Sequence, residues 1–243
     1  MRFWIVIAVT LVVAPELSAQ TAEPLVGSDL PPGFVGNLYA STRPSVAGYV
    51  QPVQIVTPGG VQATMPVGHT FGEPSSDLRV GLHIGSVYRM RVTGIPGREG
   101  EELYPTIEII DRTYPPPGLA LKYPIRIDID NDDLLAALSG QMVTRVVYLE
   151  DTVSASDIAQ TELPTRPTEA AAYQDPLDVA DALGRPVAIV RIGSLTPPNQ
   201  PSLLAAFFFG YPVYYPIHMP PAPASVIDEM DLQTASTTSG ATR

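Results

Sequence analysis

Apolar and polar residues alternate strictly along much of the middle of the chain. Leu78, Val80, Leu82 and Ile84 occupy every second position, and the same alternation returns in Tyr88–Val92 and Ile125–Ile129. Successive side chains of a β-strand point to opposite faces, so this period sorts the apolar set onto one face. Since a sheet with one buried and one solvated face is usually antiparallel, the pattern predicts antiparallel strands.

Two shorter alternating runs precede this region. Val53–Thr57 and Val61–Met65 are separated by Pro58-Gly59-Gly60. Glycine tolerates the positive φ angles that a tight turn requires. The spacing therefore predicts a β-hairpin between the two runs.

Two later stretches share one order of signals: acidic residues, a short helical run, a glycine and an apolar run. Asn131-Asp132-Asp133 and Gly140 bracket the first stretch, and Asp175-Pro176 and Gly184 bracket the second. Acidic residues favour helix N-termini and glycine ends helices, so this order predicts two short helices. A strand is expected after each helix, and because both strands are apolar on both faces we expect them near the sheet centre. These strands are 143–149 and 187–192.

The pattern as a whole predicts a mainly β domain over residues 51–195. We expect an antiparallel β-sandwich or partly open barrel with two short capping helices. The alternative is an α+β fold in which strands 125–129 and 142–149 pair in parallel through the helix between them. The 12 residues between those strands are close to the minimum for such a crossover, so this alternative ranks second.

The N-terminus carries the pattern of a secretory signal peptide over residues 1–19. Arg2 precedes the apolar run 3–14, which is too short to span a bilayer, and Leu17-Ser18-Ala19 offers small residues for cleavage after Ala19. The alternative is an uncleaved anchor. We expect an exported protein of the periplasm, cell envelope or extracellular space, with no transmembrane span in the mature chain.

The remaining segments lack a sustained period. Residues 20–50 contain several prolines and glycines and predict an extended leader. Residues 196–223 form an arm rich in proline and aromatic residues, and the polar residues 224–243 predict a disordered tail.

Composition excludes several functions. The net charge of −11 repels phosphate backbones, so we expect no nucleic-acid binding. The chain has no cysteine, which excludes thiol catalysis and thiolate metal sites. His69, His83 and His218 have no partner at metal-binding spacing, and we expect no cofactor and no metal ion. The acidic run 128–133 resembles part of a calcium loop, but helix capping explains the same residues.

The arm is the strongest candidate for an interaction surface, because soluble monomers rarely expose so much apolar area. It would either pack on its own domain or a second copy, which we favour, or bind an envelope protein, a polymer or a membrane surface. A second candidate surface is the polar sheet face with Tyr114, Tyr123 or Arg89. The aromatic residues of the arm are Phe207, Phe208, Phe209, Tyr211, Tyr214 and Tyr215.

Three segments, 103–108, 146–151 and 184–193, resemble segments of uncharacterised exported proteins of planctomycete-type bacteria. The resemblance covers about residues 78–194 and leaves both ends out. It implies an envelope or secreted location and no particular chemistry.

Together these observations favour a non-enzymatic exported protein that is a structural or assembly component of the bacterial cell envelope. The alternative is a carbohydrate- or ligand-binding β-sandwich module. A hydrolase that uses Glu99, Glu101 or Glu102 ranks third, because a charged loop tip is the commoner reason for such a cluster.

Overall fold

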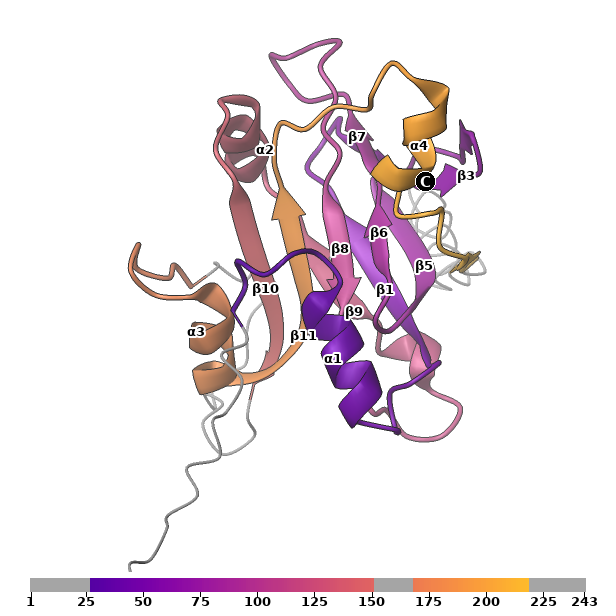
Figure 1. Cartoon of the computed structure of the whole chain (residues 1–243), viewed down its shortest axis with the longest axis vertical. Coiled ribbons are helices and arrows are strands. Elements are labelled where there is room, and N and C mark those ends of the chain that lie inside the picture. The colour runs from indigo at the N-terminus through magenta and orange to yellow at the C-terminus, as the bar shows by residue number, and fades with distance from the viewer. Residues whose placement is uncertain (1–26, 151–167, 219–243) are drawn as a thin grey trace, which may run out of the picture.

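The computed structural model describes residues 27–150 and 168–218. In this structure 33% of the residues belong to strands and 20% to helices, so the fold is mainly β. Two four-stranded sheets carry the architecture, which is β-sandwich-like as the alternation predicts (Figure 1). The predicted signal peptide 1–19 and tail 224–243 lie outside the described residues.

The first sheet has the strand order β12-β5-β1-β9. Its central pair is antiparallel, with Val53 opposite Val80, whereas β9 runs parallel to β1. Strand β12 comes from the arm and pairs antiparallel with β5. The strands are β1 (Val50–Val56), β5 (Asp77–His83), β9 (Ile125–Asp128) and β12 (Tyr214–Pro216).

The second sheet has the order β10-β11-β8-β6 and is antiparallel throughout. Two additional antiparallel pairs, β2 with β7 and β3 with β4, extend the end of the molecule near the arm. The strands of the second sheet are β6 (Val87–Arg89), β8 (Thr106–Ile109), β10 (Val143–Glu150) and β11 (Gly184–Ile192). The shorter strands are β2 (Gln62–Thr64), β3 (Pro66–Val67), β4 (Thr70–Phe71) and β7 (Arg91–Thr93).

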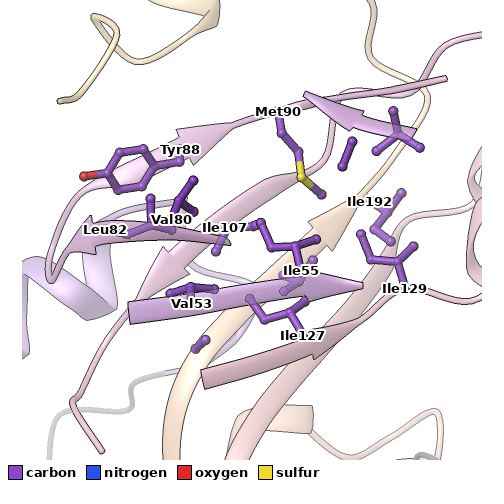
Figure 2. Packing of buried hydrophobic residues seen from close by; sticks show 14 of the residues in the cluster. Val53, Ile55, Val80, Leu82, Tyr88, Met90, Ile107, Ile127, Ile129 and Ile192 are labelled. Atoms are coloured by element: carbon purple, nitrogen blue, oxygen red, sulfur yellow. The ribbon is translucent and has the colours of Figure 1, made fainter. Parts of the chain in front are cut away.

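The main hydrophobic core lies between the two sheets. Figure 2 shows Val53 and Ile55 of β1 beside Ile107 of β8, with Leu82 and Tyr88 near one end. All five side chains are buried. Val53, Ile55, Leu82 and Tyr88 occupy the alternating positions that the sequence assigns to the apolar face, whereas β8 is buried on both faces. Burial of this apolar area is the main stabilising contribution of the sandwich.

Helices α1 and α3 cover the outer face of the second sheet (Figure 1). Val35 of α1 and Leu177 of α3 pack on Ile189 of β11 in a second, smaller core. Helix α2 closes the main core with Leu134 and Ala137. The helices are α1 (Phe34–Thr42), α2 (Asn131–Leu138), α3 (Pro176–Leu183) and α4 (Pro201–Phe207), with a 3-10 turn, η1, at Ala120–Lys122.

The two capping helices are confirmed. Helix α3 has the expected N-cap Asp175, whereas the N-cap of α2 is Asp130, directly before the expected Asn131-Asp132-Asp133. The Asp130 carboxylate accepts the Asp133 amide at 2.8 Å and begins α2. The Asp175 carboxylate accepts the Leu177 amide at 2.7 Å, and Pro176 occupies the first turn of α3. Each cap satisfies an amide that the helix itself leaves without a partner.

The predicted hairpin between 53–57 and 61–65 is wrong. The turn forms, because the Val61 amide donates to the Pro58 carbonyl, but β1 then pairs with β5 and β9. Strand β2 pairs with β7 instead. The turn reverses the chain without pairing the two strands, and Val53 and Ile55 of β1 are buried in the main core between the two large sheets.

Three other expectations need correction. The extended leader is wrong over Phe34–Thr42, which form α1. Strand β10 lies at an edge of its sheet and is half-buried, so its predicted central place is wrong, whereas β11 is central and buried. The parallel crossover of the α+β alternative does not form, since β9 and β10 belong to different sheets.

A buried ion pair fixes the segment before α1 to the second sheet. Glu108 of β8 is fully buried and accepts both Arg191 Nη1 at 3.1 Å and the Gly36 amide at 2.7 Å. Arg191 also donates to the Ser28 and Leu30 carbonyls. Gly36 permits the approach of α1, since a Cβ there would lie 3.0 Å from the Gly85 Cα. The N-terminal segment is therefore an integral part of the domain.

Candidate functional site

The arm packs its first aromatic residues on its own domain. Phe207 and Phe208 are buried, and their ring centroids lie 5.5 and 6.2 Å from that of Tyr104. Phe208 also meets the ring of Phe71 edge to face at 5.8 Å. Edge-to-face aromatic pairs add about 0.5–1.5 kcal/mol to the burial of their area. This half of the arm stabilises the fold.

Two arginines of the polar sheet face lie against these rings. The Arg89 guanidinium lies 4.1 Å from the Phe207 centroid and donates to the Phe207 carbonyl at 2.8 Å. The Arg91 guanidinium lies 4.1 Å from the Phe71 centroid. Arg89 also lies 5.0 Å from the centroid of Phe209, which is half-buried. The expected polar face with Arg89 is therefore covered by the arm.

The chain reverses direction after α4 through three consecutive positive φ angles. Phe209, Gly210 and Tyr211 have φ of 53°, 76° and 55°. Non-glycine residues adopt this left-handed conformation at a cost, which packing must offset. The reversal brings the Tyr211 ring back onto Phe208, where the two stack at 5.4 Å.

The end of the arm completes the first sheet and keeps an exposed side. Tyr88 donates its hydroxyl to the Val213 carbonyl at 2.9 Å, which positions β12 beside β5. Tyr214 is half-buried and packs against the main core. The Val213 and Tyr215 side chains are 63% and 50% exposed, although the Tyr215 ring contacts His83 at 5.8 Å. The arm thus has an inner structural side and an outer apolar side.

Burial raises the pKa of the Tyr104 hydroxyl, and its hydrogen bond to Glu102 raises it further. The hydroxyl of an unfolded tyrosine ionises at about pH 10. The folded state therefore holds this proton to higher pH, and the stability that the group contributes is complete below about pH 10 and is lost above it. We expect the unfolding free energy of the wild type to fall more steeply above about pH 10 than that of Tyr104→Phe.

Urea unfolding at a series of alkaline pH values measures this difference in slope. Tyr173→Phe is the control, because the Tyr173 side chain is 89% exposed. Equal slopes for the wild type and Tyr104→Phe would contradict the assignment.

The expected place of Tyr114 and Tyr123 on the polar sheet face is wrong, because neither belongs to a strand. The two tyrosines instead line a shared hollow of about 560 Å³. Their side chains are 48% and 46% exposed. The connection between β8 and β9 carries both tyrosines, and the Thr113 hydroxyl donates to the Tyr123 carbonyl at 3.1 Å to close it. We call this site the tyrosine hollow. Its lining includes Gln54, Tyr114, Lys122, Tyr123, Arg126 and Leu149.

Arginines support one wall of the tyrosine hollow. The guanidinium groups of Arg112 and Arg185 lie 4.7 and 5.0 Å from the centroid of the Tyr114 ring. Arg112 also stacks at 3.8 Å on Tyr49. Tyr114 itself has a positive φ of 50°, a conformation that fixes its direction. No sequence pattern indicates this wall, because its residues come from distant parts of the chain.

The acidic residues that invited catalytic or metal roles have structural partners. Arg145 binds Asp130 at 3.2 Å and Asp133 at 2.6 Å, while Asp128 pairs with Arg126 at 2.8 Å. No group of three or more potential ligands is placed to hold a metal ion among residues 27–150 and 168–218.

The loop-tip glutamates and the histidines do not converge on a shared centre. Glu101 pairs with Arg98 at 2.9 Å, and Glu99 accepts the Gly97 amide at 3.2 Å. His69 and His83 lie against different tyrosines, Tyr211 and Tyr215.

Each carboxylate that is buried in the described part of the chain is paired with an arginine. Glu108 pairs with Arg191 as described above, and Asp111 accepts Arg43 at 3.1 Å and Arg185 at 2.9 Å. Asp133 accepts Arg145. A buried carboxylate needs such a partner, so these groups serve the fold. A second hollow, of about 590 Å³, is lined by Arg191 and Arg89 among others. Arg191 is bound to Glu108 and Arg89 to the Phe207 carbonyl, so both arginines of this hollow stabilise the fold.

Helices long and apolar enough to cross a membrane are not found in the described part of the chain. Comparisons of the chain with protein-family models, curated proteins and solved structures found no match.

Proposed function

We propose that this chain is a non-enzymatic, exported protein that acts by contact, as a structural or assembly component of the bacterial cell envelope. The signal-peptide pattern of residues 1–19 supports export. The buried carboxylates support a role without catalysis, because each is occupied by an arginine that holds the fold.

The outer side of the arm is the observation that carries this proposal. Tyr215 is exposed on β12, the edge strand of the first sheet, Val213 is exposed directly before β12, and Leu203 is exposed on α4. The hydrogen bond from Tyr88 and the pairing with β5 hold β12 in place. A partner would therefore meet a preformed apolar surface, which lowers the entropic cost of association.

Point variants test the proposal better than deletion of the arm, since deletion would uncover Tyr104 and the edge of β5. We expect the double variant Val213→Ser, Tyr215→Ser to shift from the envelope fraction to the soluble fraction of disrupted cells. Its free energy of unfolding in urea should stay within about 1 kcal/mol of the wild-type value, because both side chains are largely exposed.

The control is Tyr173→Ser, which removes an exposed tyrosine far from the arm in the sequence. This variant should fractionate like the wild type. If the double variant stays in the envelope fraction while folded, the arm is not the contact surface.

A second candidate function, a carbohydrate- or ligand-binding module, is favoured by the tyrosine hollow. Two half-exposed aromatic rings beside polar side chains are suited to stack on a small ligand and orient it through hydrogen bonds. Retention on polysaccharide gels tests this function. Tyr123→Ser should lose retention, whereas Tyr173→Ser should keep it.

A further inference from the structure

We infer that the tyrosine hollow binds an acidic sugar chain, with a uronate carboxylate paired to Lys122 and the sugar rings against Tyr114 and Tyr123. This inference rests on the second candidate function above and adds the charge of the ligand.

The charge of the hollow is opposite to that of the chain. The whole chain has a net charge of −11, yet Lys122 and Arg126 line the hollow and none of its described lining residues is acidic. Arg112 and Arg185 add two guanidinium groups behind the Tyr114 ring. A local field of one sign raises the concentration of ligands of the opposite sign.

Two of these four cations are neutralised by the protein. Asp128 pairs with Arg126 at 2.8 Å, and Asp111 pairs with Arg185 at 2.9 Å. Lys122 and Arg112 have no carboxylate partner within residues 27–150 and 168–218, and the Arg112 Nε is buried without a hydrogen-bond acceptor there. Lys122 and, behind the Tyr114 ring, Arg112 are therefore the two cations of this site that no carboxylate pairs with among the described residues.

Lys122 is placed to meet a ligand. It is exposed on η1, lines the hollow, and its Nζ lies 5.9 Å from the Tyr123 centroid. A carboxylate on a ring that covers Tyr123 would come within reach of this ammonium. The ligand that combines a carboxylate with flat apolar C–H faces and many hydroxyl groups is a uronic-acid chain. An acidic peptide offers the charge without those faces.

Lys122 is the only lysine of the chain, so an amine-reactive acylating reagent modifies one side chain. We expect saturating polygalacturonate to slow acylation of Lys122 in the full-length protein about tenfold, as followed by peptide mass spectrometry. The methyl-esterified form of the same polymer is the matched neutral probe and should give no protection. Polyglutamate, a peptide polyanion, should protect far less.

Variants separate the charge from the rings. Lys122→Gln should weaken polygalacturonate binding about fivefold and reduce its salt dependence, whereas Lys122→Arg should bind like the wild type. Tyr123→Ser should weaken it roughly tenfold. The control, Arg98→Gln, removes an exposed cation at the 97–101 loop and should change nothing.

Each other outcome has one meaning. If the esterified polymer binds as tightly as polygalacturonate, and Tyr123→Ser loses this binding, the requirement for an acidic ligand is contradicted. The sugar-binding function would then still hold. Equal protection by polyglutamate would make the ligand an acidic peptide and overturn the inference. Absence of binding by both polygalacturonate forms would overturn the inference, and absence of retention on every polysaccharide gel would overturn the sugar-binding function as well.

Discussion

Replacing Glu108 by alanine is expected to lower the free energy of unfolding by about 3–5 kcal/mol, because it leaves a buried charge without its partner. Arg191 is only 9% exposed and donates to Glu108 at 3.1 Å. The Gly36 amide, which donates to the same carboxylate at 2.7 Å, would lose its acceptor as well. The variant should therefore also loosen α1 from the second sheet.

Urea unfolding of the full chain measures the loss. The control is Glu101→Ala, which breaks an exposed pair with Arg98 and should cost less than about 1 kcal/mol. The double variant Glu108→Leu, Arg191→Met should lose less stability than Glu108→Ala, because it removes both buried charges. A loss below about 1 kcal/mol for Glu108→Ala would show that the pair does not anchor the segment.

The second large effect is expected at the inner side of the arm. Phe208→Ala should cost about 3–5 kcal/mol, because a buried phenyl ring leaves a cavity when it is removed. The ring is 4% exposed and contacts those of Phe207, Phe71 and Tyr211. Loss of these contacts should also destabilise the pairing of β12 with β5.

Hydrogen exchange reports the arm separately from the global stability. The Ile217 amide, which donates to the Arg79 carbonyl at 2.9 Å, should exchange faster in Phe208→Ala. Leu203→Ala is the matched control, since this apolar side chain of the same arm is 48% exposed. If Phe208→Ala costs no more than Leu203→Ala, the inner side of the arm does not stabilise the domain.

The alternation of apolar residues predicts the sandwich well because the core depends on it directly. Val80 and Leu82 are buried, whereas Arg79 and His83 beside them remain half-exposed. The caps of α2 and α3 are equally local, since Asp130 and Asp175 bind amides two or three residues ahead. Patterns fixed within a few residues are thus readable from the sequence.

Features that depend on distant partners are not readable in this way. Helix α1 is only nine residues long, and Gly36 within it and Gly33 directly before it argue against a helix. It is stabilised by contacts that the sequence does not show, among them the bond of the Gly36 amide to Glu108, 72 positions away. The failed hairpin has the same cause, because the turn at 58–60 does not determine the partner of β1.

The candidate sites likewise combine features that the sequence shows with features that depend on distant partners. Their aromatic members are visible in the sequence, since Phe207, Phe208, Tyr114 and Tyr123 stand out by type. Their division into a buried inner side, an exposed outer side and a separate hollow depends on the fold. The cationic wall behind Tyr114 joins residues 112 and 185, and only the pairing of distant strands brings them together.

Site-specific photo-crosslinking in intact cells tests the proposed contact function most directly. A photo-reactive amino acid at position 215 should give a discrete crosslinked species with an envelope protein or a second copy of the chain. The same probe at position 173, which is also exposed, should give none. Crosslinks that are equal from both positions, or that are absent from position 215 in the folded protein, would contradict the proposal.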